Sequence, residues 1–120
     1  MSLEVQIHDM DSHLLIKAVG EYTMANFCSL FDRVSEESEN YAKQKVILDV
    51  TEVSGTIPVM DLYQLGEECS RVWKSELRIA LVSPAGGINK FFEDVAWNRG
   101  VQVSVVSNQA SAIEWVNSEH

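Results

Sequence analysis

Residues 45–53 constrain the fold more than any other part of this sequence. They read Lys-Val-Ile-Leu-Asp-Val-Thr-Glu-Val and are nearly continuously apolar and β-branched up to Asp49. A strand with this composition is buried on both faces of its sheet, as strands of parallel sheets are when helices cover them. The stretch therefore predicts a central strand in a layered α/β fold.

The rest of the chain alternates between strand and helix periodicity. Val5 and Ile7 alternate with polar neighbours, and a second strand at residues 14–19 ends at Gly20, so the two form a hairpin. The later segments predict, in order, a helix over 24–43, the strand at 45–53, a helix over 58–73, a strand at 77–82, a helix over 88–99, a strand at 101–105 and a last helix after Asn108.

This order, β-β-α-β-α-β-α-β-α, defines the class of fold. Repeated strand–helix alternation after an antiparallel hairpin requires right-handed crossovers and a mainly parallel sheet. We expect one α/β domain over residues 1–120, in which a mixed, mainly parallel five-stranded sheet carries four helices. Helical spacing assigns Tyr41, Phe91 and Ile113 to the buried faces of their helices.

The chain is acidic, with a formal net charge of −9 and a pI near 4.6. Nucleic acids are therefore excluded as partners, because phosphate binding needs clustered Lys and Arg. The charge also gives no support to peripheral membrane contact and leaves only apolar insertion open for it. No run approaches the roughly 18 consecutive apolar residues of a membrane span, and the sequence shows no signal-peptide pattern.

The two cysteines, Cys28 and Cys69, fall on the predicted apolar faces of different helices. Cysteines in such positions act as small apolar side chains. A chain without an export signal points to a reducing compartment. We therefore expect unpaired, mostly buried thiols and a cytoplasmic location.

A polar loop of Ser54, Gly55 and Thr56 follows the central strand. In an open α/β sheet, ligands and modifications gather where the carboxyl end of a strand meets the next helix. This loop is therefore the first place to expect function, although it contains no phosphate-binding glycine pattern. Thr56 is predicted to cap the helix that follows.

Three carboxylates, Asp49, Glu52 and Asp61, surround this loop in the sequence. A carboxylate pair performs acid–base chemistry when burial or repulsion separates the two pKa values. Acids exposed in a loop or a first helical turn are the favoured interpretation, and no catalytic histidine or nucleophile–base pair accompanies them. We therefore expect a protein that is not an enzyme, and a small hydrolase is the most distant alternative.

Two other segments contain residue types that bind metals or phosphates. His8, Asp9, Asp11 and His13 are metal-ligand types, but strand alternation and a turn would scatter their side chains. Residues 83–87 (Ser-Pro-Ala-Gly-Gly) precede a helix without the Lys-Ser/Thr of a phosphate loop or the dinucleotide-binding glycines. The sequence predicts no metal and no cofactor.

Apolar residues outside the core stripes give the best candidate site. Met60 and Tyr63 lie off the buried stripe of the second predicted helix. They predict an apolar opening at the mouth between the first two helices, where a methionine-rich surface accepts varied ligands or partners. The opening comprises Met24, Phe27, Ile57, Met60 and Tyr63. Plain packing between the two helices is the alternative.

An exposed tryptophan is the second candidate for contact with a partner. Trp97 is predicted to lie opposite the core stripe of its helix. Tryptophan is enriched at the centres of protein interfaces, so this position predicts a contact surface. A neighbouring element that covers the side chain is the alternative.

Motifs along most of the chain are those of a known family. They are Val46, Ile47, Leu48, Asp49 and Val50; Asp61, Leu62, Leu65 and Gly66; Phe91, Phe92, Glu93 and Ala96; Asn98, Arg99 and Gly100; and Val103, Val105, Ala112, Trp115 and Val116. With the order of elements, they resemble the STAS domain, the fold of sulphate-transporter cytoplasmic domains and bacterial anti-sigma-factor antagonists. The chain is similar in particular to the SpoIIAA-like, or STAS/SEC14-type, group of small bacterial proteins.

The resemblance implies a protein that works by binding. Anti-sigma-factor antagonists of this fold start the helix after the central strand with an Asp-Ser pair, and the partner kinase phosphorylates that serine. Residues 57–61 (Ile-Pro-Val-Met-Asp) occupy this place without a hydroxyl group, and we do not expect Ser54 or Thr56 to act as the switch.

Two binding hypotheses follow from these observations. The leading one is a non-enzymatic module that docks a protein partner or carries a small apolar ligand, as the SEC14-like side of the resemblance implies. The alternative is an anti-sigma-factor-antagonist-type regulator that contacts a protein kinase or a sigma-factor regulator.

Overall fold

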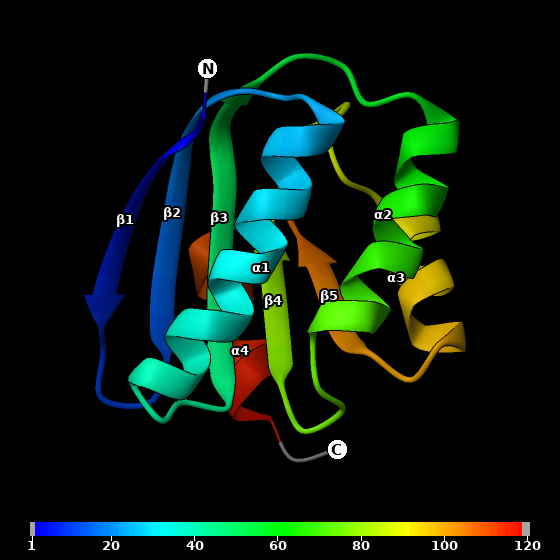
Figure 1. The fold of residues 1–120 in the computed structure, drawn as a ribbon. Helices are drawn as coiled ribbons and strands as arrows, with labels where there is room; N and C mark the ends of the chain where they lie inside the picture. Colours follow the sequence, from blue (N-terminus) through cyan, green and yellow to red (C-terminus); the bar gives the residue numbers. More distant parts are fainter. Residues whose placement is uncertain (1, 119–120) are drawn as a thin grey trace.

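The computed structural model describes residues 2–118, which form five strands and four helices in the predicted order (Figure 1). The elements are β1 (Glu4–Asp9), β2 (Leu14–Glu21), α1 (Met24–Asn40), β3 (Lys45–Ser54), α2 (Val59–Val72), β4 (Arg78–Val82), α3 (Lys90–Asn98), β5 (Gln102–Val106) and α4 (Gln109–Asn117). None of these four helices has both the length and the apolar character needed to cross a membrane.

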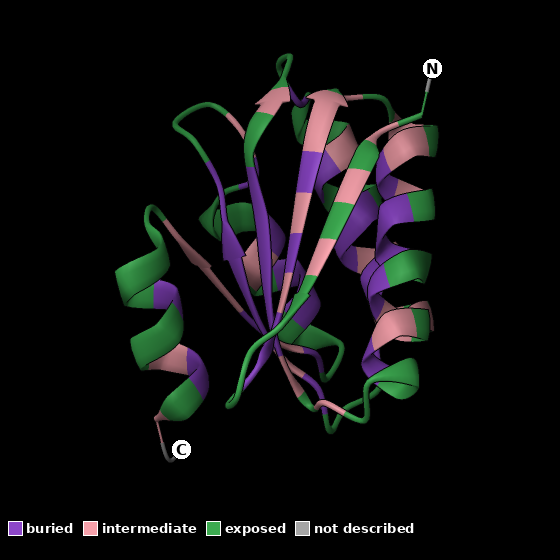
Figure 2. Ribbon diagram, turned by 90° about the vertical axis from the view of Figure 1, so that its left-hand side faces the viewer, coloured by how far each residue is buried: buried purple, intermediate pink, exposed green. Residues whose placement is uncertain are grey.

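The strands form one sheet in the order β1-β2-β3-β4-β5. β1 runs antiparallel to β2 and the other neighbours are parallel, which confirms the predicted mixed, mainly parallel sheet. Each crossover moves the chain one strand further in the same direction, and right-handed crossovers then place their helices on one face. α1, α2 and α3 accordingly pack on one face, whereas α4 packs on the other (Figure 2).

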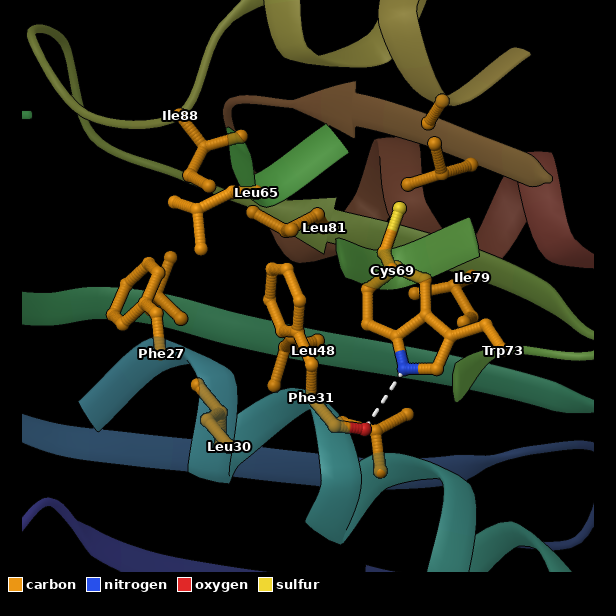
Figure 3. Close-up of a cluster of buried hydrophobic side chains, with 14 of the residues drawn as sticks. Phe27, Leu30, Phe31, Leu48, Leu65, Cys69, Trp73, Ile79, Leu81 and Ile88 are labelled. Carbon is orange, nitrogen blue, oxygen red and sulfur yellow. Dashed lines mark hydrogen bonds between the residues drawn. The ribbon is translucent and has the colours of Figure 1, made fainter. Parts of the chain in front are cut away.

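The main core lies between the sheet and the three helices α1–α3. Phe31 of α1 packs against Trp73 at the end of α2 and Phe92 of α3, with ring centroids 4.6 Å and 6.0 Å apart. The Trp73 indole N–H donates a hydrogen bond to the Phe31 carbonyl at 3.0 Å, which satisfies its polar atom inside the core (Figure 3). Residues 46–50 of β3 are all buried, as expected of a central strand.

A smaller apolar cluster lies on the opposite face of the sheet. There α4 buries Ala112 and Val116 against Ile47 of β3 and against Ala80 and Val82 of β4. α4 lies over β3, β4 and β5. On this face, therefore, no helix of residues 2–118 covers β1 and β2.

Three apolar residues that helical spacing assigns to buried faces lie on the surface instead. Tyr41 is exposed because α1 ends one residue before it. Phe91 is exposed because it lies about 100° around α3 from Phe92, which points into the core. Ile113 is exposed because α4 rests on the sheet through Ala112 and Val116, which lie on another side of the helix.

β2 continues past Gly20, the position expected to end it. Gly20 and Glu21 pair with Val53 and Ser54, so both strands are longer than predicted. Gly20 has a φ of +144°, and a Cβ added there would lie 3.0 Å from Leu3 Cδ2. Glycine lets the strand pass through a conformation that other residues rarely adopt.

Candidate functional site

The carboxyl ends of β2 and β3 lie side by side at one end of the strands, where the chain continues to α2 (Figure 1). Ser54 is held in the sheet, because its carbonyl accepts the Tyr22 N–H at 2.8 Å and its hydroxyl donates to the Gly20 carbonyl at 3.3 Å. Gly55 follows with a φ of +108°, in the region that favours glycine. The polar loop therefore starts at Gly55 and includes Thr56.

α2 begins at Val59, with Pro58 as its N-cap residue. The prediction that Thr56 caps this helix is wrong, because no side chain of residues 2–118 caps it. Pro58 has no side-chain acceptor, and its ψ of 153° leads extended chain into the helix. Asp61 supplies negative charge in the first turn, where the helix dipole favours it. The N-cap position of α2 therefore carries no hydroxyl group.

Three exposed apolar side chains share one face at the start of α2. Val59 and Met60 are each 67% exposed, and Tyr63 is 39% exposed. Val59 and Met60 lie four and three residues before Tyr63 along the helix, which brings the three side chains together. These three residues are termed the α2 cluster. Val59 is not among the predicted site residues, although its spacing from Tyr63 indicates the same face.

The other residues of the predicted apolar opening lie elsewhere. Phe27 and Ile57 are core residues, 1% and 8% exposed, so neither reaches the surface beside Met60. Met24 is half-buried and borders a hollow of about 400 Å³ between α1 and α2. The rest of its lining is Cys28, Gln64, Glu67, Glu68 and Arg71. The structure thus separates the α2 cluster from Phe27 and Ile57, and charged side chains dominate the hollow.

Tyr22 joins the end of β2 to the first turn of α2. Its hydroxyl donates a hydrogen bond to Asp61 Oδ2 at 2.7 Å, and its ring packs edge-on against Phe27 at 4.9 Å between centroids. Burial, together with the bond to Asp61, raises the pKa of Tyr22 well above its usual range. The hydroxyl therefore remains a donor that fixes the position of α2, and no local pattern in the sequence indicates it.

Asp49 is buried in β3, so the expectation of an exposed acid is wrong at this position. Its Oδ1 accepts bonds from the Thr51 N–H at 2.9 Å and hydroxyl at 2.7 Å, and its Oδ2 accepts one from the Gln109 amide at 2.8 Å. Burial by itself would raise the pKa of Asp49, but these hydrogen bonds outweigh burial and hold the pKa below its ordinary value. The carboxylate links β3 to α4, whereas Glu52 is exposed and pairs with Lys17.

Trp97 and Glu93 of α3 cover the outer edge of β5. The Trp97 indole is about half exposed, and its N–H donates to the Val103 carbonyl. Glu93 Oε1 accepts the Val105 N–H at 2.7 Å. Both backbone groups belong to an edge strand, where such groups otherwise lack protein partners. Trp97 therefore has a structural role, and its contact with a partner remains a prediction.

The two cysteines are free thiols, as predicted. Cys69 is buried, and burial raises the pKa of its thiol to about 12. Cys28 is only half-buried beside the hollow between α1 and α2, although burial also raises its pKa. The expectation of mostly buried thiols therefore holds for Cys69, whereas Cys28 is partly open to solvent.

The metal-ligand residue types near β1 do not converge. Asp9 pairs with Lys43 at 3.2 Å, while His13 is buried with its Nδ1 2.8 Å from the Ser12 hydroxyl oxygen. Residues 2–118 contain no group of three or more His, Cys, Asp or Glu side chains placed to hold a metal. The loop at residues 83–87 leads to Asn89, whose side chain accepts hydrogen bonds from the first free N–H groups of α3.

No protein-family model matches this chain, and no curated protein matches its sequence. Solved structures define its class instead. A mixed five-stranded sheet with this order of four helices is the STAS-domain fold, also described as SpoIIAA-like. The resemblance predicted from the sequence motifs is therefore confirmed for the fold.

Three solved structures illustrate the likeness. An anti-sigma factor antagonist from Mycobacterium paratuberculosis is 13% identical, with a TM-score of 0.65 over 97% of this chain and 95% of that chain. A protein from Shewanella loihica with a SpoIIAA-like fold is 21% identical, with a TM-score of 0.54 over 96% and 93%. The unphosphorylated anti-sigma factor antagonist SpoIIAA is 16% identical, with a TM-score of 0.51 over 97% and 100%. At these identities the likeness establishes the fold alone.

Proposed function

We propose that this chain is a non-enzymatic regulator of the anti-sigma-factor-antagonist type that docks a protein partner through the α2 cluster. The observation that carries the proposal is the exposure of Val59, Met60 and Tyr63 on one helix face, at the carboxyl edge of the sheet. Grouped apolar side chains of this kind suit a protein contact. Two of the similar structures are themselves anti-sigma factor antagonists, which supports this class of function.

The charge near the α2 cluster indicates the kind of partner surface. Glu21 ends β2, Glu52 lies near the end of β3, and Asp61 lies in the first turn of α2, all at this edge of the sheet. Electrostatic complementarity steers encounter and selects partners. The Arg99 guanidinium lies over the Tyr63 ring on the side of α3, so the acidic part of this surface is on the side of β2. The partner surface therefore combines an apolar centre with Lys or Arg side chains on that side.

Docking in this proposal does not depend on phosphorylation at the start of α2. Pro58 occupies the N-cap position, so a kinase meets no hydroxyl group there. The Ser54 hydroxyl is bonded within the sheet edge. We expect incubation with anti-sigma kinases to leave the mass of the protein unchanged. Stoichiometric phosphate on Ser54 or Thr56, with a change in affinity, would contradict this part of the proposal.

A matched pair of variants tests the docking surface. Met60→Asp introduces a charge into the α2 cluster, whereas Ile113→Asp makes the same kind of change at an exposed apolar residue on the opposite face of the sheet. Affinities for a panel of purified anti-sigma factors and kinases are measured by calorimetry. We expect Met60→Asp to weaken binding by about tenfold or more and Ile113→Asp to leave it unchanged. Equal effects of both variants, or no binding to any member, would overturn the proposal.

Carriage of a small apolar ligand is the second candidate function. The hollow beside Met24, between α1 and α2, supports it, whereas the burial of Phe27 and Ile57 weakens it. Native mass spectrometry of freshly purified protein distinguishes the two functions. A retained apolar molecule, lost in a Met24→Asp variant, would favour carriage over docking.

A further inference from the structure

The two edges of the sheet are built differently. At the outer edge of β5, Glu93 accepts a hydrogen bond from one N–H of the strand, and Trp97 donates a hydrogen bond to one of its carbonyl groups. At the opposite edge, β2 is the only helix or strand of residues 2–118 that lies beside β1 (Figures 1 and 2). An edge strand with unpaired backbone groups is a template for another strand.

β1 has charged side chains only at its two ends, Glu4 and Asp9, and lacks most of the other features that usually protect an edge strand from such pairing. Its sequence, Glu-Val-Gln-Ile-His-Asp, contains neither lysine nor proline. It pairs with β2 in an unbroken register without a bulge. Val5 and Ile7 are half-buried and pack on the main core, so no charge points inward from the middle of the strand.

Space for the side chains of an added strand lies beside β1. α1 covers β2 and β3 but does not extend over β1. A groove of about 230 Å³ lies next to the start of β1, and its apolar wall consists of Leu3, Val5 and Leu30. The rest of its lining is Ser2, Asn26, Ser29 and Arg33. An added strand would therefore meet backbone groups and an apolar wall at the same place.

We propose that β1 pairs antiparallel with β1 of a second copy of this chain, with the two-fold axis at Gln6. In this register Val5 faces Ile7 of the partner subunit, and Glu4 faces His8 of the partner subunit. Each pair occurs twice because the interface is isologous. Residues directly opposite in an antiparallel pair point to the same face and contact each other. The Glu4 carboxylate accepts a hydrogen bond from the imidazole, so the strand complements itself in hydrogen bonding as well as in its apolar residues.

The same pairing rule selects this register over its neighbours. If the axis moved to Ile7, Glu4 would face Met10 of the partner subunit, and its hydrogen bond with the imidazole would be lost. If it moved to Val5, Glu4 would face an uncharged Gln6 of the partner subunit. The interface joins two short strands and lies below about 1,200 Å², and both copies are acidic, so the dimer is weak and forms at high protein concentration.

Charge exchange across the interface tests this pairing. Sedimentation velocity at neutral pH, from micromolar to near-millimolar protein, should show a monomer–dimer equilibrium. Glu4→Lys and His8→Glu should each raise the Kd by about tenfold or more, because each change affects two pairs. An equimolar mixture of the two variants should recover the dimer. In the mixed dimer the introduced lysine faces the introduced glutamate, and the other pair keeps Glu4 with His8.

Glu36→Lys, on the exposed surface of α1, is the matched control, because it changes the net charge as Glu4→Lys does. It should leave the Kd within about twofold, and far-UV circular dichroism shows whether each variant is folded. A protein that stays monomeric at every concentration would overturn the proposal and leave β1 open to an extended segment of another protein. A dimer that neither β1 variant weakens, or that mixing does not restore, would overturn it as well. The outcome is independent of docking through the α2 cluster.

Discussion

Replacing Glu93 by alanine tests how the outer edge of β5 is held. The Glu93 carboxylate makes two interactions: Oε1 accepts the Val105 N–H at 2.7 Å, and Oε2 pairs with Lys90 Nζ at 2.8 Å. The Lys90 side chain is 75% exposed, so solvent reduces the contribution of the ion pair to nearly nothing. The loss in the variant therefore comes from the bond to the backbone.

The expected size of the loss follows from the burial of the two groups. A hydrogen bond to a charged group contributes about 1.5–3 kcal/mol. Val105 is half-buried, so water reaches its freed N–H in part and the lower end of this range applies. We expect Glu93→Ala to lower the free energy of unfolding by about 1.5 kcal/mol, which corresponds to about 6 °C in Tm for a chain of this size.

Two further variants separate the backbone bond from the charge. Asp94 pairs with the same Lys90 amine at 2.8 Å but lies on the solvent side of α3, so Asp94→Ala should cost less than about 0.5 kcal/mol. Glu93→Gln keeps an acceptor oxygen without the charge, and we expect it to lose about half as much as Glu93→Ala.

Urea denaturation followed by tryptophan fluorescence and far-UV circular dichroism measures all three variants. Coincident transitions by the two probes establish that a single free energy of unfolding describes each protein. Equal losses for Glu93→Ala and Asp94→Ala would refute the reasoning, because the bond to Val105 would then contribute nothing beyond the shared ion pair.

Gly66→Ala places a Cβ 2.6 Å from Val95 Cγ1. Thermal melting should therefore show that the free energy of unfolding falls by about 1–2 kcal/mol, despite the better helix propensity of alanine. A rise in the free energy of unfolding would contradict close packing of α2 on α3. Folding lowers the pKa of Asp49, so its contribution to stability is complete above the unfolded-state pKa of about 4 and is lost as the pH falls through the folded pKa. The Asp49→Asn variant should therefore have a lower free energy of unfolding than the natural protein at neutral pH, and the difference should become smaller in acid. A difference that does not change with pH in urea titrations would count against this. Cys28 should react with a maleimide in the native protein before Cys69, as mass spectrometry of the labelled peptides can show, and faster labelling of Cys69 would contradict its burial.

The class of fold could be predicted from hydrophobic periodicity, because few arrangements of these strands and helices bury all of the apolar faces that the sequence indicates. Residues 46–50 need apolar contacts on both faces, and right-handed crossovers then define the sheet and the side on which α1–α3 lie. The exposure of Met60 and Tyr63 follows from the same periodicity, because the buried stripe of α2 has a clear phase.

Local sequence patterns did not predict where each helix and strand ends, or which apolar side chains of a helix are buried. Phe91 and Phe92 are adjacent and equally apolar, and the way α3 packs on the sheet and on α2 decides which of them enters the core. Phe27 and Ile57 are as apolar as Met60, yet they pack inside because the sheet and α2 close over them.

The polar contacts that define the candidate surfaces were decided by the tertiary structure alone. Tyr22 reaches Asp61, and Glu93 reaches Val105, only because packing sets the distance between elements that are separate in the sequence. Hydrophobic periodicity records which side of an element is buried, but not which polar atom of another element lies 3 Å away. For that reason the sequence determined the architecture of this protein, while the packing of its elements determined which edges and faces remain free to bind.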